Sequence, residues 1–219
     1  MYKWWCDRLT SALLLERCAP GTALNRDTSE PEQDMVISGL LRRLWRHPED
    51  GHPFRPLRQM CNAWADEFEL ELASTPGWLD PGLARAGIEL LRSLPAESVE
   101  SVVLCTDLHA GNVLAAEREP WLVIDPKPHV GDRTYDALQH ILNCTERLSR
   151  DPRRYTRRMA DLLDLDTHRL ELWLFARCVQ ESINDPALRH VAEQLAPSWS
   201  DEGPPCPNSI RPRKTSSGR

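Results

Sequence analysis

The sequence lacks any hydrophobic run long enough to cross a membrane, and it lacks the apolar core of a signal peptide. A spanning helix needs about 18 or more consecutive apolar residues, and no such run occurs among the 219 residues. Charged residues also interrupt positions 1–8, which is unlike a signal peptide. We therefore expect no membrane partner and, by default, a cytoplasmic location.

Two further absences argue against a zinc site and against a nucleic-acid partner. The seven cysteines include no Cys-x-x-Cys pair, so we expect reduced thiols rather than a zinc site. There is no basic excess either, because 27 Lys and Arg against 33 Asp and Glu give a net charge of −6. Nonspecific nucleic-acid binding needs a basic surface, so we expect no nucleic-acid partner. A cationic small substrate is compatible with this charge.

Helical periodicity dominates most of the chain. A capping box at Ser29 and Glu32 precedes apolar residues at helical spacing up to Leu44, which predicts a helix. Residues 47–56 are rich in Pro and Gly and predict a loop. Further amphipathic helices are predicted from apolar spacing over residues 57–72, 81–94, 138–142, 159–163 and 170–179.

Short apolar runs predict a few strands, over residues 12–17, 102–104, 113–114 and 122–124. The chain after Pro197 is rich in Pro, Ser, Gly and basic residues, so we expect residues 197–219 to form a disordered tail. Together these patterns predict an α+β protein that is predominantly helical, with short strands around a polar loop.

That polar loop carries the most informative motif. Asp107 and Asn112 are five positions apart, in an Asp-Leu-x-x-x-Asn pattern, and Asp125 follows an apolar run. In kinases this spacing gives a carboxylate that accepts a hydroxyl proton and an amide that binds magnesium, and Mg²⁺ prefers such oxygen ligands. A single Asp in a loop is more simply explained as a turn cap. Three such residues at this spacing, with Leu108 at the expected position and a predicted strand on each side, favour phosphoryl transfer.

A two-metal phosphoesterase is a competing interpretation of the same loop. Asp107 and His109, together with Asp132, faintly resemble such a site. Two-metal sites need several His and carboxylate ligands at strand ends. Most of the remaining histidines fall instead on predicted helices or loops, so this alternative ranks lower.

The motifs together resemble the aminoglycoside phosphotransferase family. The resemblance is carried by Thr-Asp-Leu-His-Ala-Gly-Asn-Val-Leu from position 106, Trp-Leu-Val-Ile-Asp-Pro-Lys-Pro from position 121, and Val-Gly-Asp-Arg-Thr-Tyr-Asp from position 130. It covers nearly the whole chain to about Ala196, and it is closest to the branch of streptomycin 6-phosphotransferases and hydroxyurea phosphotransferases. The fold that it implies is the C-terminal lobe of a protein-kinase-like enzyme.

The resemblance also implies roles for individual residues. Asp107 is the implied catalytic base, and Asn112 and Asp125 are the implied Mg²⁺ ligands. The segment around Glu16 and Cys18 resembles the family hinge, where backbone groups meet the adenine of ATP. The implied substrate is a small molecule, and streptomycin, another aminoglycoside and hydroxyurea all stay open. The implied organisation is a monomer with residues 1–25 as the end of an N-terminal lobe and hinge, and residues 26–196 as the helical lobe.

The sequence departs from the family pattern in two ways. Cys105 and Thr106 replace the usual His-Gly before the catalytic Asp, and Thr is strained there if the backbone needs a positive φ. Nothing before Ala12 supplies the strands and phosphate-gripping Lys of an N-terminal lobe, so we expect a chain that starts at the hinge. The alternative function is therefore a non-catalytic remnant that folds or binds substrate without turnover.

Other residues have simpler structural interpretations. Asp136 is expected to cap a helix or to brace the catalytic loop, and Trp45, Trp64 and Trp173 are expected in the core. Lys127 is a lesser candidate for contact with phosphate or substrate. Four other polar residues could reach the predicted cleft, but the simpler interpretation is that they are exposed and have no function. They are His109, His129, Glu181 and Asp185.

Overall fold

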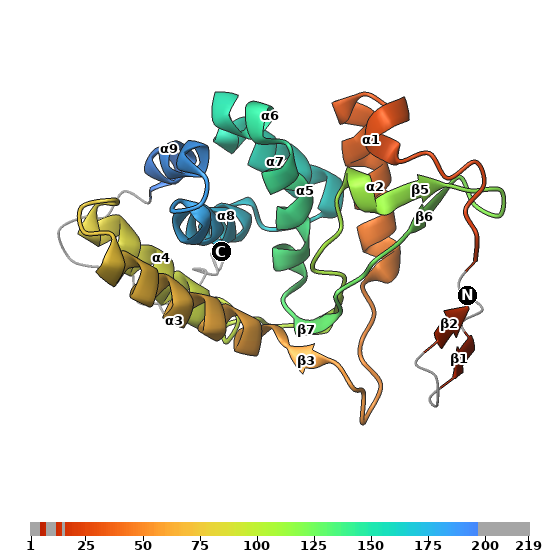
Figure 1. The fold of residues 1–219 in the computed structure, drawn as a ribbon, viewed down its shortest axis with the longest axis horizontal. Helices are drawn as coiled ribbons and strands as arrows, with labels where there is room; N and C mark the ends of the chain where they lie inside the picture. The colour runs from red at the N-terminus through yellow and green to blue at the C-terminus, as the bar shows by residue number, and fades with distance from the viewer. Residues whose placement is uncertain (1–4, 8–11, 15, 197–219) are drawn as a thin grey trace, which may run out of the picture.

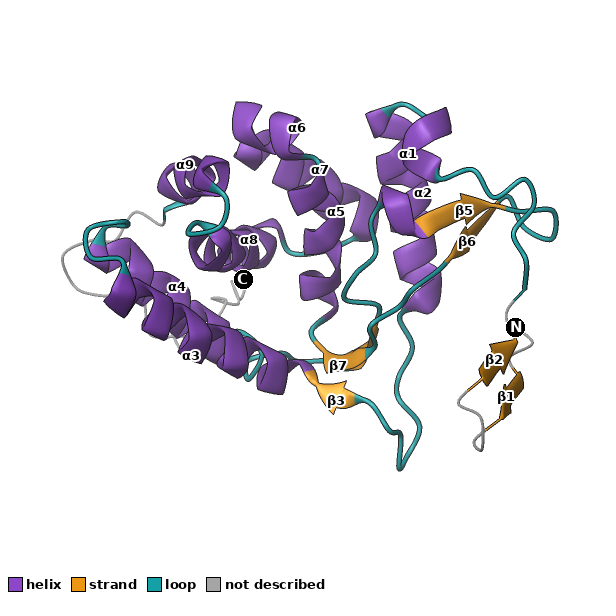
Figure 2. Cartoon of the chain, in the orientation of Figure 1, coloured by secondary structure: helices purple, strands orange, loops and turns teal. Residues whose placement is uncertain are grey.

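The computed structural model describes residues 5–7, 12–14 and 16–196. Helices make up most of this part (Figure 2), and the helical segments predicted from periodicity are confirmed. The α-helices are α1 Leu24–Asp27, α2 Glu30–Leu44, α3 Leu57–Ser74, α4 Pro81–Ser93, α5 Leu138–Asn143, α6 Thr145–Arg150, α7 Pro152–Leu163, α8 Thr167–Glu181 and α9 Pro186–Leu195. Short 3₁₀ turns occur at η1 Ala110–Asn112 and η2 Arg133–Ala137.

The strands in the described part of the chain form three small sheets. In the first, β1 Trp5–Asp7 pairs antiparallel with β2 Ala12–Leu14. The second has the order β3-β7-β4, from β3 Arg55–Pro56, β7 His129–Gly131 and β4 Val102–Leu104. The third pairs β5 Val113–Ala115 with β6 Trp121–Val123.

The strand predictions are confirmed around the polar loop and incomplete elsewhere. Strands β4, β5 and β6 lie where apolar runs predicted them. Strands β3 and β7 were missed, because elements of two or three residues leave no periodicity to detect. Position 15 and the predicted tail at 197–219 lie outside the described residues.

The core is centred on α8, against which α4, α7 and α9 pack. Its Trp173, Leu174 and Phe175 side chains are fully buried, so the core role expected for Trp173 is confirmed. Figure 1 shows α3 and α4 along one edge of the molecule, with α1, α2 and the β5–β6 sheet at the opposite edge. No described helix has the length and apolar character needed to span a membrane.

Buried thiols in this core are chemically inert. Cys61, Cys105 and Cys178 are free and buried. Burial raises the pKa of Cys61 and of Cys105 to about 12, so neither forms a thiolate near neutral pH.

A buried carboxylate joins α2 to the helices that follow the catalytic loop. Asp34 of α2 is fully buried and accepts hydrogen bonds from His140 Nε2 at 3.0 Å, from both terminal nitrogens of Arg147 at 3.0 and 2.7 Å, from Arg158 Nε at 2.7 Å and from Tyr155 Oη at 3.3 Å. These donors come from α5, α6 and α7. Because an unpaired buried charge is costly, this one side chain holds four helices in register.

A close helix contact predicts a large effect from one methyl group. A Cβ at Gly87 of α4 would lie 2.4 Å from Val179 Cγ1 of α8, so Gly87→Ala forces the two helices apart. We expect a loss of about 1–3 kcal/mol in the free energy of unfolding, measured by urea denaturation. The matched control is Gly39→Ala in α2, which has nothing within 4 Å and should gain about 0.5–1 kcal/mol. A neutral Gly87→Ala would contradict the close packing.

The Asp34 cluster predicts an acid-labile component of stability. Burial raises the pKa of Asp34, but the bonds from His140, Arg147 and Arg158 outweigh burial and lower the pKa from 3.8 to about 2. A lowered folded-state pKa stabilises the protein above the unfolded pKa, near pH 4, and this contribution disappears as the pH falls through about 2. It amounts to about 2 kcal/mol.

Substitution of Asp34 by Asn tests this acid dependence. Asp34→Asn should cost about 3–5 kcal/mol at pH 7 and should flatten the fall in stability below pH 4, as followed by urea denaturation at stepped pH. The matched control is Asp161→Asn, at an exposed position on α7, which should change stability by less than about 0.5 kcal/mol. If the free energy of unfolding of Asp34→Asn fell below pH 4 as steeply as that of the unmodified chain, the role of this cluster would be refuted.

Candidate active site

The catalytic-loop candidate connects β4 to β5 and is tied to the segment that leads from β6 to Asp125. Asn112 Nδ2 donates a hydrogen bond to the backbone oxygen of Asp107 at 3.0 Å. The backbone N–H of Ile124 donates to the backbone oxygen of Asn112 at 3.0 Å. The three residues predicted from sequence spacing are therefore brought together: Asn112 bonds directly to Asp107, and Asp125 follows Ile124.

The carboxylate of Asp107 has a defined partner on each oxygen. Gln139 Nε2 of α5 donates to Oδ1 at 3.1 Å, and Lys127 Nζ binds Oδ2. The same ammonium lies 4.0 Å from Asp125 Oδ2. The Asp107 side chain is 15% exposed and that of Asp125 is 69% exposed, so both are accessible to a bound molecule. No sequence pattern indicates Gln139, which lies 32 positions from the carboxylate that it contacts.

Asp136 holds the backbone in front of Asp107. Its Oδ1 accepts from the Thr106 N–H at 2.6 Å, and its Oδ2 accepts from the Cys105 N–H at 3.0 Å and from Trp45 Nε1 at 3.0 Å. Burial raises the pKa of Asp136, although these backbone bonds partly offset the rise. The bracing role expected of Asp136 is therefore confirmed. Trp45, which was expected in the core, packs against it but is only partly buried.

The backbone at Thr106 adopts the strained conformation anticipated for that position. Its φ is +53°, in the left-handed region where a β-branched residue costs about 1–3 kcal/mol. The Thr106 hydroxyl donates to the backbone oxygen of Lys127, a bond that Gly could not make. Asp125 also has a positive φ, of +48°, which Asp tolerates better than most residues.

The hinge candidates lie beside the β5–β6 sheet. Glu16 Oε2 accepts from Arg118 Nε at 2.8 Å, and Cys18 is half-buried. The Gly21 N–H donates to the backbone oxygen of Ala115 at 3.0 Å, which anchors the segment that follows them to β5. Among the described residues, neither Glu16 nor Cys18 is hydrogen-bonded to the catalytic loop.

A cleft of about 640 Å³ opens beside Asp107. Its wall has mixed charge, because Glu67, Glu181 and Arg177 contribute to it together with the catalytic loop. Arg177 is buried, lies 4.1 Å from the centre of the Trp64 ring and donates to Glu181 Oε1 at 2.8 Å. The remaining lining residues are Arg55, Gln59, Met60, Ala63, Thr106, Lys127, His129 and Gln139.

This cleft changes the interpretation of several residues. Glu181 was expected at a solvated helix end, but it forms part of the cleft wall and is paired with Arg177. Trp64 packs against the core and also faces the cleft, so its core assignment was incomplete. Asp185 caps α9 by accepting from the Ala187 N–H at 2.9 Å, which is a structural role.

The two loop histidines differ in position. His129 is buried, lines the cleft and has Nδ1 3.0 Å from the backbone oxygen of Lys127. His109 Nδ1 accepts from the Gly111 N–H at 3.2 Å. Burial lowers the pKa of His109, which favours the neutral imidazole that this bond requires.

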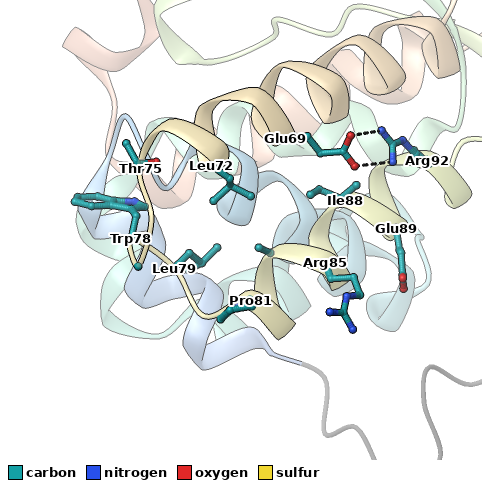
Figure 3. A pocket seen from close by; sticks show the side chains of 12 residues that line it. Glu69, Leu72, Thr75, Trp78, Leu79, Pro81, Arg85, Ile88, Glu89 and Arg92 are labelled. Atoms are coloured by element: carbon teal, nitrogen blue, oxygen red, sulfur yellow. Dashed lines mark hydrogen bonds and ion pairs between the residues drawn. The ribbon is translucent and has the colours of Figure 1, made fainter.

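A second hollow, of about 450 Å³, is separate from this site (Figure 3). It lies between α3 and α4 and is lined in part by Leu72, Trp78 and Ile88. At one side of it, Arg92 binds Glu69 at 2.9 Å. None of the residues predicted to be functional lines this hollow.

The donor groups near Asp107 suit a hard cation. The amide nitrogen of Asn112 is bonded to the Asp107 backbone, which leaves the amide oxygen for another partner. The Asp125 carboxylate is largely exposed. An amide oxygen and a carboxylate, completed by water and phosphate oxygens, are the usual ligands of Mg²⁺ in nucleotide-dependent enzymes.

Solved structures with a similar fold are small-molecule kinases. Choline kinase LicA from Streptococcus pneumoniae matches 91% of this chain and 69% of its own, with a TM-score of 0.54 and 11% identity. Its complex with AMP matches with a TM-score of 0.52 and 12% identity. An ethanolamine kinase from Plasmodium vivax matches 90% of this chain and 67% of its own, with a TM-score of 0.51 and 13% identity. The fold is therefore that of the protein-kinase-like small-molecule kinases, as the sequence motifs predicted.

Sequence comparison defines the family within this class. Residues 7–207 match the model described as aminoglycoside/hydroxyurea antibiotic resistance kinase, and the chain belongs to this family. It is 35% identical over 206 residues to a streptomycin 6-kinase from Streptomyces griseus, covering 87% of this chain and 66% of that protein. It is 33% identical over 181 residues to a hydroxyurea phosphotransferase from Kitasatospora aureofaciens, covering 81% of this chain and 52% of that protein.

These comparisons confirm the kinase family suggested by the motifs and do not support the phosphoesterase alternative. The chain spans two thirds or less of the length of these curated relatives.

The Asp136 brace can be tested apart from any activity. Asp136→Asn keeps the side-chain size but leaves one oxygen for three N–H donors, from Cys105, Thr106 and Trp45, so a buried N–H loses its partner. We expect the free energy of unfolding to fall by about 2–4 kcal/mol and the amides of Cys105 and Thr106 to exchange faster in hydrogen-exchange measurements. The exposed Asp50→Asn should change stability by less than about 0.5 kcal/mol and leave both amides protected. Unchanged exchange in Asp136→Asn would refute the brace.

Proposed function

We propose that the chain carries the acceptor-side active site of a kinase that transfers the γ-phosphoryl group of ATP to a hydroxyl of a streptomycin-like aminoglycoside. The observation that carries the proposal is the position of Asp107. Its carboxylate lies in the wall of the cleft, on a loop that also holds Asn112 and is bonded to the strand leading to Asp125. This combination suits phosphoryl transfer, which depends on positioning and charge stabilisation.

In the proposed reaction, Asp107 receives the proton of the acceptor hydroxyl. The hydroxyl oxygen bonds to the γ-phosphorus as the bond from that phosphorus to the β-bridging oxygen breaks, and ADP leaves. Gln139 and the backbone brace from Asp136 keep the carboxylate oriented toward the cleft. Such positioning is the main contribution that a protein makes to this chemistry.

Asn112 and Asp125 are the proposed ligands of Mg²⁺, through their amide and carboxylate oxygens. Bound Mg²⁺ supplies charge neutralisation on the phosphates. We propose that backbone groups near Glu16 and Cys18 bind the adenine of ATP. This proposal is supported by their position beside the β5–β6 sheet, whose far end leads to Asp125.

The cleft favours a streptomycin-like acceptor over hydroxyurea. Its volume of about 640 Å³ is suited to a sugar-sized ligand and far exceeds what hydroxyurea would fill. Glu67 supplies a carboxylate for a cationic acceptor. Hydroxyurea stays a second candidate because one relative is a hydroxyurea phosphotransferase. The cytoplasmic location and the monomeric state predicted from the sequence belong to this proposal.

A non-catalytic protein of the same family is the alternative. It is favoured by Cys105 and Thr106, which replace the His-Gly usual in the family before the proposed catalytic Asp. Such a protein would keep the acceptor cleft and bind the aminoglycoside without phosphorylating it.

Replacement of Asp107 separates these alternatives. With ATP, Mg²⁺ and streptomycin, the unmodified chain should release ADP and give streptomycin that carries one phosphoryl group, detected by mass spectrometry. Asp107→Ala should lower kcat by about 100- to 10,000-fold while calorimetry still detects streptomycin binding. The control Asp161→Ala, at an exposed position on α7, should retain full activity. Binding without turnover in the unmodified chain would instead support the non-catalytic alternative.

A further inference from the structure

Lys127 has a backbone held by two hydrogen bonds and an exposed side chain. Its backbone N–H donates to the backbone oxygen of Cys105 at 3.0 Å, and its backbone oxygen accepts from the Thr106 hydroxyl. These bonds extend the pairing of β4 with β7, which aligns Leu104 with His129. The side chain of Lys127 is 60% exposed, so its ammonium can leave its present partners without disturbing the strand pairing.

The ammonium of Lys127 lies between the two carboxylates on which the proposed reaction depends. It binds Asp107 Oδ2 and lies 4.0 Å from Asp125 Oδ2. The other cleft cations are placed differently, because Arg177 is paired with Glu181 and Arg55 forms no ion pair with either carboxylate among the described residues. Among the described residues that line the cleft, Lys127 is thus the cation whose ammonium lies near both carboxylates.

This position conflicts with the working state of the site. Oδ1 of Asp107 is bonded to Gln139, so the contact of Lys127 with Oδ2 places a competing donor on the oxygen that an acceptor hydroxyl would meet. A divalent cation bound to Asp125 would repel an ammonium about 4 Å from the same carboxylate. Metal binding and the Lys127–Asp107 pair therefore oppose each other.

We propose that Lys127 is a latch, whose ammonium neutralises Asp107 and Asp125 in the metal-free site and is released when a divalent cation binds. The latch rests on the proposed function, because it takes Asp125 to be a metal ligand. Its release frees Oδ2 of Asp107 only when the cation is present, which couples the availability of the base to the loading of the metal. The Lys127–Asp107 pair and the metal are thermodynamically linked. The factor by which bound metal weakens the pair is therefore also the factor by which removal of the pair strengthens metal binding.

Manganese binding tests the latch without any turnover. Mn²⁺ replaces Mg²⁺ as the probe, and electron paramagnetic resonance measures free Mn²⁺ during titration of the full chain. Lys127→Met should bind Mn²⁺ about two- to fivefold more tightly than the unmodified chain. Lys127→Arg keeps a cation at this position and should restore the original affinity. The matched control is Arg55→Met, which removes a positive charge from the same cleft but should change the affinity by less than about 1.5-fold.

The outcomes separate the latch from the metal site. If Asp125→Asn abolishes Mn²⁺ binding while Lys127→Met binds no more tightly than the unmodified chain, the metal site stands and the latch is refuted. If Lys127→Met and Arg55→Met strengthen binding equally, general charge explains the effect and the latch is again refuted. If Mn²⁺ binds neither the unmodified chain nor Lys127→Met, both the latch and the proposed metal site fail. Unchanged thermal unfolding of each variant ensures that the comparison is between folded proteins.

Discussion

The geometry of the active site depends on one buried carboxylate, that of Asp136. Its two oxygens accept two consecutive backbone N–H groups and an indole N–H. Those bonds hold Thr106 at a φ that a β-branched residue would not adopt alone, and this turn directs Asp107 into the cleft. The same hydrogen bonds offset the cost of burying the Asp136 charge and the cost of the strained Thr106 backbone. The position of Asp107 therefore depends on Asp136.

The helices and the chemistry of the loop were predictable because their signals are local. The capping box at Ser29 is present as expected, and the strain at Thr106 followed from the Thr that replaces the usual Gly of the family motif. The roles of Asp107, Asn112 and Asp125 remain predictions, although the structure brings these residues together. Their spacing was informative because each lies next to a short strand: Asp107 follows β4, Asn112 precedes β5 and Asp125 follows β6.

The rest of the site could not be predicted, because it is made by contacts between distant segments. Gln139 reaches Asp107 across 32 positions, and no periodicity marks such a pair. Arg177 and Glu181 looked like ordinary residues of an amphipathic helix, and only the packing of α8 beside the catalytic loop makes them part of the cleft. Strands as short as β3 and β7 are defined by their neighbours rather than by their own residues.

The catalytic loop is attached at its two ends to different parts of the protein. The end before Asp107 is bonded to η2 through Asp136, whereas the end at Asn112 is bonded to Ile124 and continues into the β5–β6 sheet. Two bonds join these parts, because Asn112 Nδ2 donates to the backbone oxygen of Asp107 and the N–H of Lys127, two residues after Asp125, donates to the backbone oxygen of Cys105. A displacement of the β5–β6 sheet would therefore be passed on to Asp107, so the proposed proton acceptor and the proposed metal ligands would move together rather than apart.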